Sequence, residues 1–479
     1  MPIDAIHAIQ QPNLLGKPYN FNPVMTSQEP VAVTTYEPEA ILQWQPSIDW
    51  SLLSTTTHST LSLNRPYPTI FRLLPTTAPR SSISLGEWMA IRLEVVSEFG
   101  RFWSGMDPDH QFHLDEGQQF LPLECRLLDL SDTHAPESKL RLEKRELQSA
   151  AWHGMDTLPG LGIGPSGRGG LEVCVVCDNG KEKFRGPISI EISAKSAGTM
   201  SVKPVVLGPI TLSPETIETN SGCHIFRPFL LPSRDTRSSC SRLMLVKELW
   251  HNVPQDHIWD SAFGLVDMFA KSVSEGIRNT AAPQFAGKSI LDLSAGTGVT
   301  GIFVAGLAQL ELEALQYSST PPCLSYASAT SSSLISSSSV TPPRSRIGSM
   351  ATSVMLTDIA EAMGLIDTNI ALNCSRIAPN VKVTAKELRW GKSHLNNLGM
   401  IKFDTVIASD VVYDRSSFGS LLETLNGLCI PGRTTIYMGC KRRAQYRAAE
   451  DEFFQMIRKE FIVKMSTSDH DLHILRLTK

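Results

Sequence analysis

The stretch Ser289-Ile-Leu-Asp292-Leu-Ser-Ala-Gly296-Thr-Gly298-Val-Thr-Gly301 decides the fold class of this chain. Its apolar first half, Ser289–Leu293, predicts a short buried strand, and the glycine-rich half predicts a tight turn that opens a helix. Small residues let the backbone of such a turn approach a ligand closely, and the first N–H groups of the helix can bind polar atoms. The stretch therefore predicts an α/β fold with a ligand site at this turn.

An acidic residue at the end of the next strand tests this interpretation, because nucleotide-binding proteins share the glycine pattern. Such a carboxylate accepts hydrogen bonds from both ribose hydroxyls and is expected roughly 20 residues after the turn. Asp358 lies 60 residues after Gly298, but removing the 34 residues 317–350 leaves 26. Between Ser318 and Ser349, 13 of 32 residues are Ser, a composition too polar to offset its ordering entropy. We therefore predict a disordered Ser-rich insertion at 317–350 and a ribose-binding Asp358.

Three regions follow from composition and periodicity. Residues 1–84 are interrupted by many Pro residues and are expected to be irregular or flexible. Residues 85–240 contain alternating apolar runs between Gly- and Pro-bearing turns, which predicts a β-rich domain or extension. Residues 241–479 alternate helical and strand patterns, which is typical of a parallel α/β sheet, and they end in two strand-like runs.

Bulk composition excludes several classes of protein. The formal net charge of −4 gives no global argument for nucleic acid or an anionic membrane as partner. No secretory signal and no apolar run long enough to span a membrane is recognisable. Nine scattered Cys fit free thiols in the cytosol or nucleus, and Cys174-Val-Val-Cys177 lacks a second ligand pair, so no metal site is predicted.

Five motifs in order resemble one family, the methyltransferase-like protein-lysine methyltransferases of family 16 with a D-x-x-Y signature. The motifs are His257-Ile-Trp259-Asp260-Ser-Ala, Leu291-Asp-Leu-Ser-Ala-Gly-Thr-Gly298, Leu356-Thr-Asp358, Glu387-Leu-Arg-Trp390-Gly391 and Ala408-Ser-Asp410-Val-Val-Tyr413. The resemblance covers roughly 240 residues without the Ser-rich insertion. It implies a Rossmann-like, seven-stranded class I core behind the β-rich region, with S-adenosyl-L-methionine as cofactor.

The resemblance also implies a role for each motif. Trp259 is expected over the methionine end of the cofactor, Asp358 at the ribose, Trp390 beside the adenine and Ser409 next to the cofactor. The loop beneath the cofactor comprises Asp292, Ser294, Ala295, Gly296 and Gly298. Two of these depart from the family pattern: Asp292 stands where many relatives have Glu, and Ser294 where many have Gly. The added Cβ of Ser294 in a tight turn is expected to weaken cofactor binding.

Asp410 and Tyr413 are the candidate catalytic residues, since they follow a parallel strand at the edge where such sheets bind ligands. We expect Asp410 to orient the acceptor amine and Tyr413 to shape its channel. The structural alternatives are a turn for these two residues, a helix N-cap for Asp358, and core packing for Trp259 and Trp390. Lys441-Arg442-Arg443 is expected to be a solvated helix start, with acidic protein surface as another possible contact.

The sequence thus predicts N-methylation of lysine in a non-histone intracellular protein, in the cytoplasm or nucleus. The alternatives are a small-molecule N- or O-methyltransferase and a non-catalytic binding scaffold. A monomer without direct nucleic-acid or membrane contact is expected. The acceptor, the number of methyl groups and the role of residues 85–240 stay open.

Overall fold

The computed structural model describes the chain from Thr69 to Lys479 with gaps, the longest being 99–120, 129–139, 148–161, 213–223, 233–242 and 319–350. The region predicted to be irregular lies outside the described residues up to residue 68. The Ser-rich insertion also lies outside them, apart from Tyr317 and Ser318, which finish a helix. Among the described helices none is long and apolar enough to cross a membrane.

Seven strands of the C-terminal half form one sheet in the order β15-β14-β13-β16-β17-β19-β18. Five are parallel, and β19 is antiparallel to both β17 and β18. Their bounds are β13 Ser289–Leu293, β14 Thr352–Asp358, β15 Val381–Glu387, β16 Thr405–Ser409, β17 Thr435–Lys441, β18 Ile462–Asp469 and β19 Leu472–Thr478. This order and the closing antiparallel pair confirm the predicted Rossmann-like class I core.

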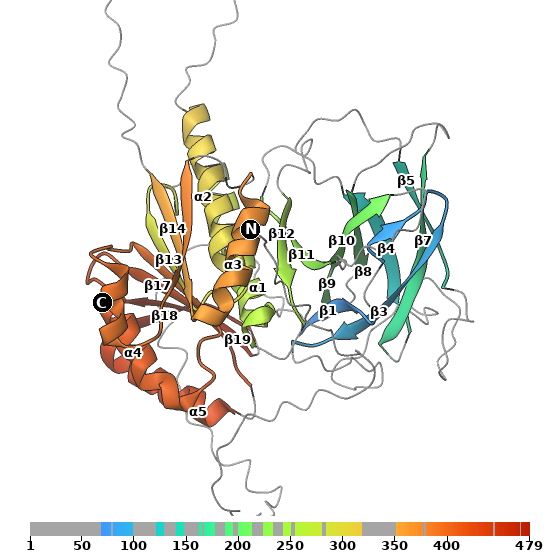
Figure 1. Ribbon diagram of the computed structural model, residues 1–479. Coiled ribbons are helices and arrows are strands. Elements are labelled where there is room, and N and C mark those ends of the chain that lie inside the picture. Colours follow the sequence, from blue (N-terminus) through green and yellow to red (C-terminus); the bar gives the residue numbers. More distant parts are fainter. Residues whose placement is uncertain are drawn as a thin grey trace, which may run out of the picture. The chain divides into compact units, whose positions relative to one another are not determined.

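Alternating side chains of the central strand serve two different cores, as expected for a strand covered on both faces. Ile290 packs in one cluster with α1, α2 and α3, whereas Leu291 and Leu293 pack in another with α4 and α5. Figure 1 shows the first three helices together on one face of the sheet. Their bounds are α1 Asp260–Asn279, α2 Val299–Ser318, α3 Ala360–Asn373, α4 Phe418–Leu428 and α5 Arg447–Glu460.

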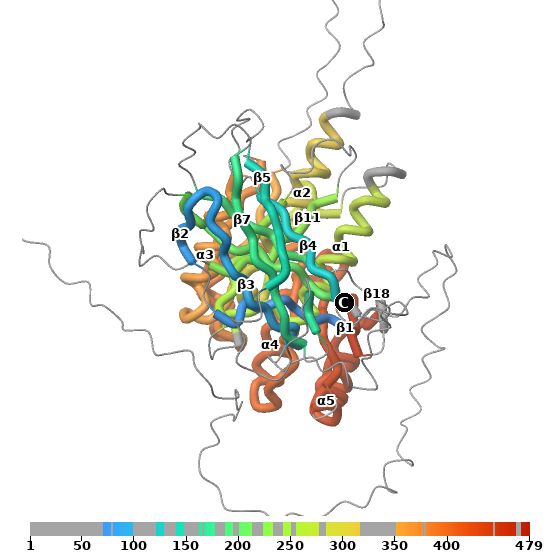
Figure 2. The backbone as a smooth tube through the Cα atoms, turned by 90° about the vertical axis from the view of Figure 1, so that its right-hand side faces the viewer, coloured from blue at the N-terminus to red at the C-terminus, as the bar shows by residue number. Residues whose placement is uncertain are grey.

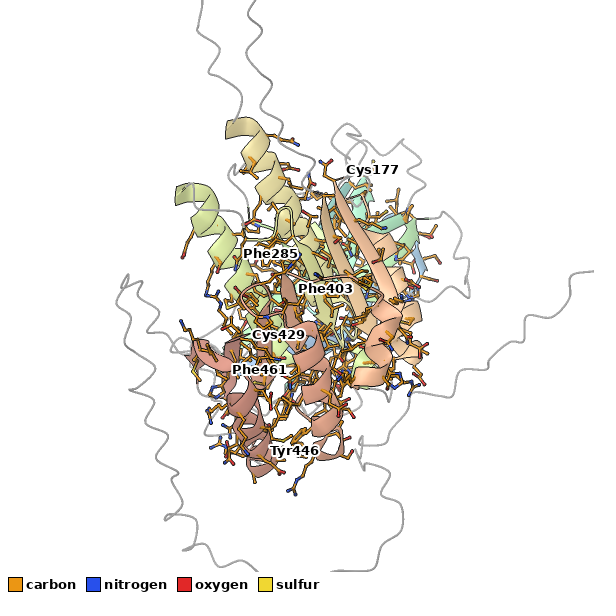
Figure 3. All side chains as sticks on the ribbon, turned by 90° about the vertical axis from the view of Figure 1, so that its left-hand side faces the viewer. Cys177, Phe285, Phe403, Cys429, Tyr446 and Phe461 are labelled. Atoms are coloured by element: carbon orange, nitrogen blue, oxygen red, sulfur yellow. The ribbon has the colours of Figure 1, made fainter. Side chains whose placement is uncertain are left out.

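The second core is visible in Figure 3, where Phe403, Cys429 and Phe461 lie beside the two C-terminal helices. All three are buried in the cluster that α4 and α5 form with the sheet. Burial of such side chains stabilises the fold by about 1.5–3 kcal/mol each. Both faces of the parallel strands are therefore closed, and only their ends can present a site.

Twelve further strands form a curled sheet with the path β12-β11-β10-β8-β4-β6-β7-β3-β1-β9, with β2 paired to β10 and β5 to β7. Figure 2 shows β5, β7 and β4 close together in this sheet. Its strands are β1 Thr69–Pro75, β2 Ser82–Ile83, β3 Trp88–Val96, β4 Leu121–Leu128, β5 Leu140–Arg145, β6 Gly162–Ile163, β7 Arg168–Cys177, β8 Pro187–Ala194, β9 Met200–Lys203, β10 Val205–Leu212, β11 His224–Leu230 and β12 Leu243–Glu248.

The bounds of this sheet differ from the predicted domain limits at both ends. The first strand begins at Thr69 rather than after residue 84, because Pro75 ends a strand instead of excluding one. The last strand, β12, extends past residue 240 into the predicted methyltransferase region. The chain from Asn64 to Lys479 forms one compact unit that contains both sheets.

Two asparagines of α3 join the two sheets. The amide of Asn373 pairs with the backbone of Leu245 through a 3.0 Å and a 2.7 Å hydrogen bond, and Asn369 pairs with Lys247 through bonds of 2.7 Å and 3.1 Å. Both side chains are fully buried. They lie one helical turn apart and match two alternate residues of β12. They therefore replace the missing neighbour strand at this edge.

Candidate functional site

The glycine-rich loop connects the end of β13 to α2 through three residues with positive φ. These are Ser294 at 59°, Gly296 at 56° and Gly298 at 81°. The loop is fixed by hydrogen bonds from Ala295 N to Thr357 O of 3.0 Å and from Gly298 N to Ala295 O of 2.8 Å. The turn that the sequence predicts is thus formed, and it lies at the carboxyl end of the parallel strands, where sheets of this kind bind ligands.

Two glycines of this segment leave no room for a side chain. A Cβ on Gly298 would lie 2.8 Å from Leu356 Cδ2, and a Cβ on Gly301 would lie 2.9 Å from Asp292 Oδ2. The backbone N–H of Gly301 donates a 2.6 Å hydrogen bond to that same oxygen. The start of α2 therefore packs directly on Asp292, and only glycine at 301 permits this approach.

Asp292 is buried and only half satisfied. Its Oδ1 has no hydrogen-bond partner among the described residues. Burial raises the pKa of its carboxyl to about 7, the Gly301 hydrogen bond opposes this rise, and the charge of Asp358 adds to it. A buried polar atom without a partner costs free energy, so Oδ1 is available to a ligand group or a water molecule.

Asp358 lies at the end of β14 and braces the loop. Its Oδ2 accepts a 2.7 Å hydrogen bond from Gly296 N, and its Oδ1 accepts one of 2.7 Å from Ile359 N. The N-cap of α3 is Ile359, so Asp358 is not the cap itself. Each carboxylate oxygen keeps a free lone-pair direction. Burial raises the pKa of this carboxyl.

Two aromatic rings, those of Trp390 and Tyr413, lie near the same carboxyl end of the parallel strands. The ring centroids are 6.1 Å apart, and the indole N–H of Trp390 donates a 2.9 Å hydrogen bond to Ser294 Oγ. Trp390 is partly buried, whereas Tyr413 is 61% exposed. The Ser294 hydroxyl therefore links the glycine-rich loop to Trp390, the residue expected beside the adenine.

Trp259 lies just before α1 beside two other rings. Its centroid is 4.6 Å from that of His257, which stacks on Trp250 at 5.1 Å. Burial lowers the pKa of His257 to about 4, so the imidazole is neutral near pH 7. At the start of the same helix, Ser261 Oγ lies 2.9 Å from Ser409 Oγ, which joins α1 to the end of β16.

Asp410 has a different environment from the one expected. Both of its oxygens are bound by Arg443, with Nη1–Oδ1 at 3.0 Å and Nη2–Oδ2 at 2.5 Å, in a buried fork. Its φ is +54°, a left-handed conformation that is rare without glycine. The carboxylate expected to orient the acceptor amine is thus already paired with a cation.

Arg443 and Lys441 also contradict the expectation of a solvated helix start. Lys441 is the last residue of β17 and lies within hydrogen-bond distance of Asp260, while Arg443 is 9% exposed. Arg72 pairs with Asp260, and Glu98 pairs with Arg443. Sequence reasoning missed both residues because they belong to no local motif. Among the described residues no cluster of His, Cys, Asp or Glu has the arrangement of a metal site.

These residues fit S-adenosyl-L-methionine. The unpaired Oδ1 of Asp292 and the free lone pairs of Asp358 provide acceptors for amine and hydroxyl donors beside the glycine-rich loop. The carboxyl ends of the parallel strands bring together the loop, Asp292, Asp358, Trp390 and Tyr413. Trp259 lies beside Arg443, whose Cζ is 5.2 Å from the indole centroid and which pairs with Asp410.

Known proteins resemble the same part of the chain. The sequence profile of a family described as lysine methyltransferase matches residues 240–331 and 346–460. EEF1A lysine methyltransferase 3 of Mus musculus is 27% identical over 45% of this chain and 68% of its own length. Protein N-lysine methyltransferase METTL21A of Mus musculus is 29% identical over 26% of this chain and 56% of its own length.

Among solved structures, the N-terminal domain of human METTL16 in complex with SAH aligns with a TM-score of 0.26 and 8% identity, over 48% of this chain and 72% of that one. The fold assignment rests on the strand order and not on this superposition. Together, the strand order, the glycine loop with Asp358, and the family match lead to one conclusion. Residues 240–331 and 346–460 match the lysine methyltransferase family, and the C-terminal sheet has the strand order of a Rossmann-like, S-adenosyl-L-methionine-dependent methyltransferase core.

Proposed function

We propose that this protein transfers a methyl group from S-adenosyl-L-methionine to the side-chain amine of a lysine in a non-histone protein. The observation that carries this proposal is the 2.7 Å hydrogen bond from Gly296 N to Asp358 Oδ2, which fixes the glycine-rich loop against the proposed ribose-binding carboxylate. Both residues lie in the part of the chain where the family match was found. The two relatives from Mus musculus are named for methylation of protein lysines, one of them on EEF1A.

The chemistry requires a neutral amine in line with the donor. When bound, S-adenosyl-L-methionine supplies the methyl group on a sulfonium. A lysine has a reference pKa near 10.4, so presenting it neutral near pH 7.4 costs about 4 kcal/mol unless the site lowers that pKa. Exclusion of water by aromatic walls and the absence of an unpaired anion both contribute to lowering it.

Tyr413 is proposed to shape the acceptor channel, next to Trp390 at the adenine. Tyr413 is exposed by 61% and leans toward the half-buried Trp390, so an incoming side chain can pass over its ring. The π faces also attract a cation before it loses its proton. We assign to Tyr413 the shaping of the channel and to Trp390 contact with the adenine.

Asp410 is proposed to orient the amine by hydrogen bonding. Because Arg443 neutralises its charge, the carboxylate accepts a hydrogen bond without strongly favouring the ammonium form. A free carboxylate at this point would raise the lysine pKa and oppose the reaction. The pairing therefore suits a group that positions a neutral nucleophile.

The remaining site residues are proposed to bind the cofactor. The roles are methionine-end contact for Trp259, amine-side contact for Asp292, loop contacts for Ser294, Ala295, Gly296 and Gly298, and a position beside the cofactor for Ser409. A monomeric enzyme in the cytoplasm or nucleus, without direct nucleic-acid contact, stays a prediction.

The test is label transfer from tritiated S-adenosyl-L-methionine into an extract of cells lacking this protein. A discrete labelled protein band whose label maps to lysine is expected, and Asp358→Ala should abolish it. Glu361→Ala, at an exposed residue in the first turn of α3, serves as the matched control and should retain the band. Label confined to small molecules would move the assignment to a small-molecule methyltransferase. Absence of both label and cofactor binding would leave a scaffold.

A further inference from the structure

A buried network of charged side chains runs from the N-terminal sheet to the D-x-x-Y motif. Three cations and three carboxylates alternate in it: Arg72, Asp260, Lys441, Glu98, Arg443 and Asp410. Arg72 lies on β1 and Glu98 follows β3, so both come from the N-terminal sheet. All six are largely buried, and Lys441 has the most exposed side chain of them at 25%.

Arg443 links the two carboxylates at the end of this network, Glu98 and Asp410. Its Nε donates a 3.1 Å hydrogen bond to Glu98 Oε1, while Nη1 and Nη2 clamp Asp410. The guanidinium also faces the ring of Trp259 at 5.2 Å. Since a guanidinium is planar and rigid, fixing its Nε edge fixes the direction in which its other edge points.

Asp410 depends on such a clamp. Its left-handed φ of +54° costs roughly 1–2 kcal/mol for a non-glycine residue. The backbone bond from Asp410 N to Gly439 O, 2.8 Å long, holds its main chain. Among the described residues, Arg443 binds both oxygens of its side chain, so the orientation of the carboxylate follows the orientation of the guanidinium.

We propose that Glu98 is a positioning residue for methyl transfer. It holds Arg443 in the orientation that aims Asp410 at the acceptor, so the N-terminal sheet supplies part of the active site. This inference rests on the proposed role of Asp410. The contact spans 345 residues of sequence and links the two sheets within one compact unit.

The second oxygen of Glu98 extends its effect to the cofactor side. Glu98 Oε2 accepts a 3.3 Å hydrogen bond from Asp260 N, directly after Trp259. That bond is long, and Asp260 is held independently by Arg72 at 2.7 Å and by Lys441. Loss of the charge on Glu98 should therefore disturb Arg443 and Asp410 more than the start of α1.

Glu98→Gln is the direct test, because Gln keeps the shape and one acceptor oxygen but removes the charge. The matched control is Glu94→Gln on β3, which removes an ion pair with Arg168 of β7 and is not part of the six groups. The maximal rate of label transfer from tritiated S-adenosyl-L-methionine into extract protein should fall about tenfold in Glu98→Gln, as expected for weakening one charge-assisted hydrogen bond. The dissociation constant for the cofactor should change less than about twofold, and Glu94→Gln should change neither.

A double-mutant cycle separates positioning from general destabilisation. If Glu98 acts through Asp410, the double variant Glu98→Gln with Asp410→Asn should be as slow as Asp410→Asn alone. Multiplied losses would overturn the inference. Arg443→Lys, which keeps the charge but loses the fork, should reproduce the lowered rate with retained cofactor binding, and it provides the readout if Glu98→Gln does not fold.

The two proposals fail in different ways. A normal rate in Asp410→Asn overturns the role of Asp410 and with it this inference. A slow Asp410→Asn beside a normal Glu98→Gln overturns the positioning role of Glu98 alone.

Discussion

The indole Nε1 of Trp390 donates a 2.9 Å hydrogen bond to the hydroxyl of Ser294, a residue with φ of 59°. A side chain in that conformation is strained, and glycine would remove the strain. The hydroxyl offsets this cost because it satisfies the N–H of a half-buried ring. Ser294 is therefore a polar link between the cofactor loop and the segment after β15, not only a substitution in a tight turn.

Substitutions at Ser294 should separate strain from hydrogen bonding. Ser294→Ala keeps the strain and loses the acceptor, so the free energy of unfolding should fall by about 1 kcal/mol. Ser294→Gly loses the same bond but relieves about 1 kcal/mol of strain, so it should be the more stable of the two. Urea denaturation of both variants measures the order, and the opposite order would contradict the link.

Asp358→Asn should weaken cofactor binding by at least tenfold. The charged acceptor toward the ribose is lost, and hydrogen bonds to charged groups are worth about 1.5–3 kcal/mol. Titration calorimetry with S-adenosyl-L-methionine gives the dissociation constant. Glu361→Gln, which removes a neighbouring exposed carboxylate, should bind like the wild type. Equal binding by both variants would exclude Asp358 from the site.

Gly301→Ala should destabilise the protein and abolish cofactor binding. The new methyl group would lie 2.9 Å from Asp292 Oδ2 and 3.0 Å from Leu356 Cγ, so the start of α2 must move. A loss of about 1–3 kcal/mol is expected from such overpacking. Gly364→Ala in α3 meets no atom within 4 Å and should instead gain up to about 1 kcal/mol. Thermal unfolding of the pair tests the contrast.

Stability should decrease with rising pH because of Asp292. Its folded-state pKa of about 7 lies above the ordinary value of 3.8, so the folded protein binds the proton more tightly. The resulting stabilisation is complete below the ordinary pKa and is lost as the pH rises through 7. Between pH 5 and pH 8 the loss is up to about 3 kcal/mol.

Asp292→Asn should remove most of this pH dependence. Asn keeps an acceptor for Gly301 N and carries no proton that titrates in this range. Urea denaturation at pH 5 and pH 8 should therefore show a smaller difference for the variant than for the wild type. The same difference in both proteins would show that another group causes it.

The cofactor half of the fold could be predicted from sequence because its signals are local. The strand, the glycine turn and Asp358 each follow from short patterns, and the spacing became regular once 317–350 was set aside. The turn at Gly298 and the closing pair β18–β19 were found for the same reason. The assigned roles of the individual site residues stay predictions.

The partners of Asp410 could not be predicted, because they depend on contacts between distant segments. Arg443 lies 33 residues from Asp410, and Glu98 lies 345 residues from Arg443. A run of Lys441-Arg442-Arg443 has the composition of a solvated surface, but its side chains pair with carboxylates from distant segments, such as Asp260, Glu98 and Asp410. Likewise, the strand at Thr69 was missed because Pro residues surround it.

The asparagine pairs on β12 also constrain the order in which the chain can mature. β12 precedes Asn369 and Asn373 by 122 and 128 residues in the bonds that they form. At a synthesis rate of about 5–20 residues per second, the exposed edge of this sheet waits roughly 6–25 seconds for α3 to emerge from the ribosome. During that interval β12 presents unpaired amides that can recruit a foreign strand. The edge of β12 is therefore unprotected in the nascent chain until the two asparagines dock on it.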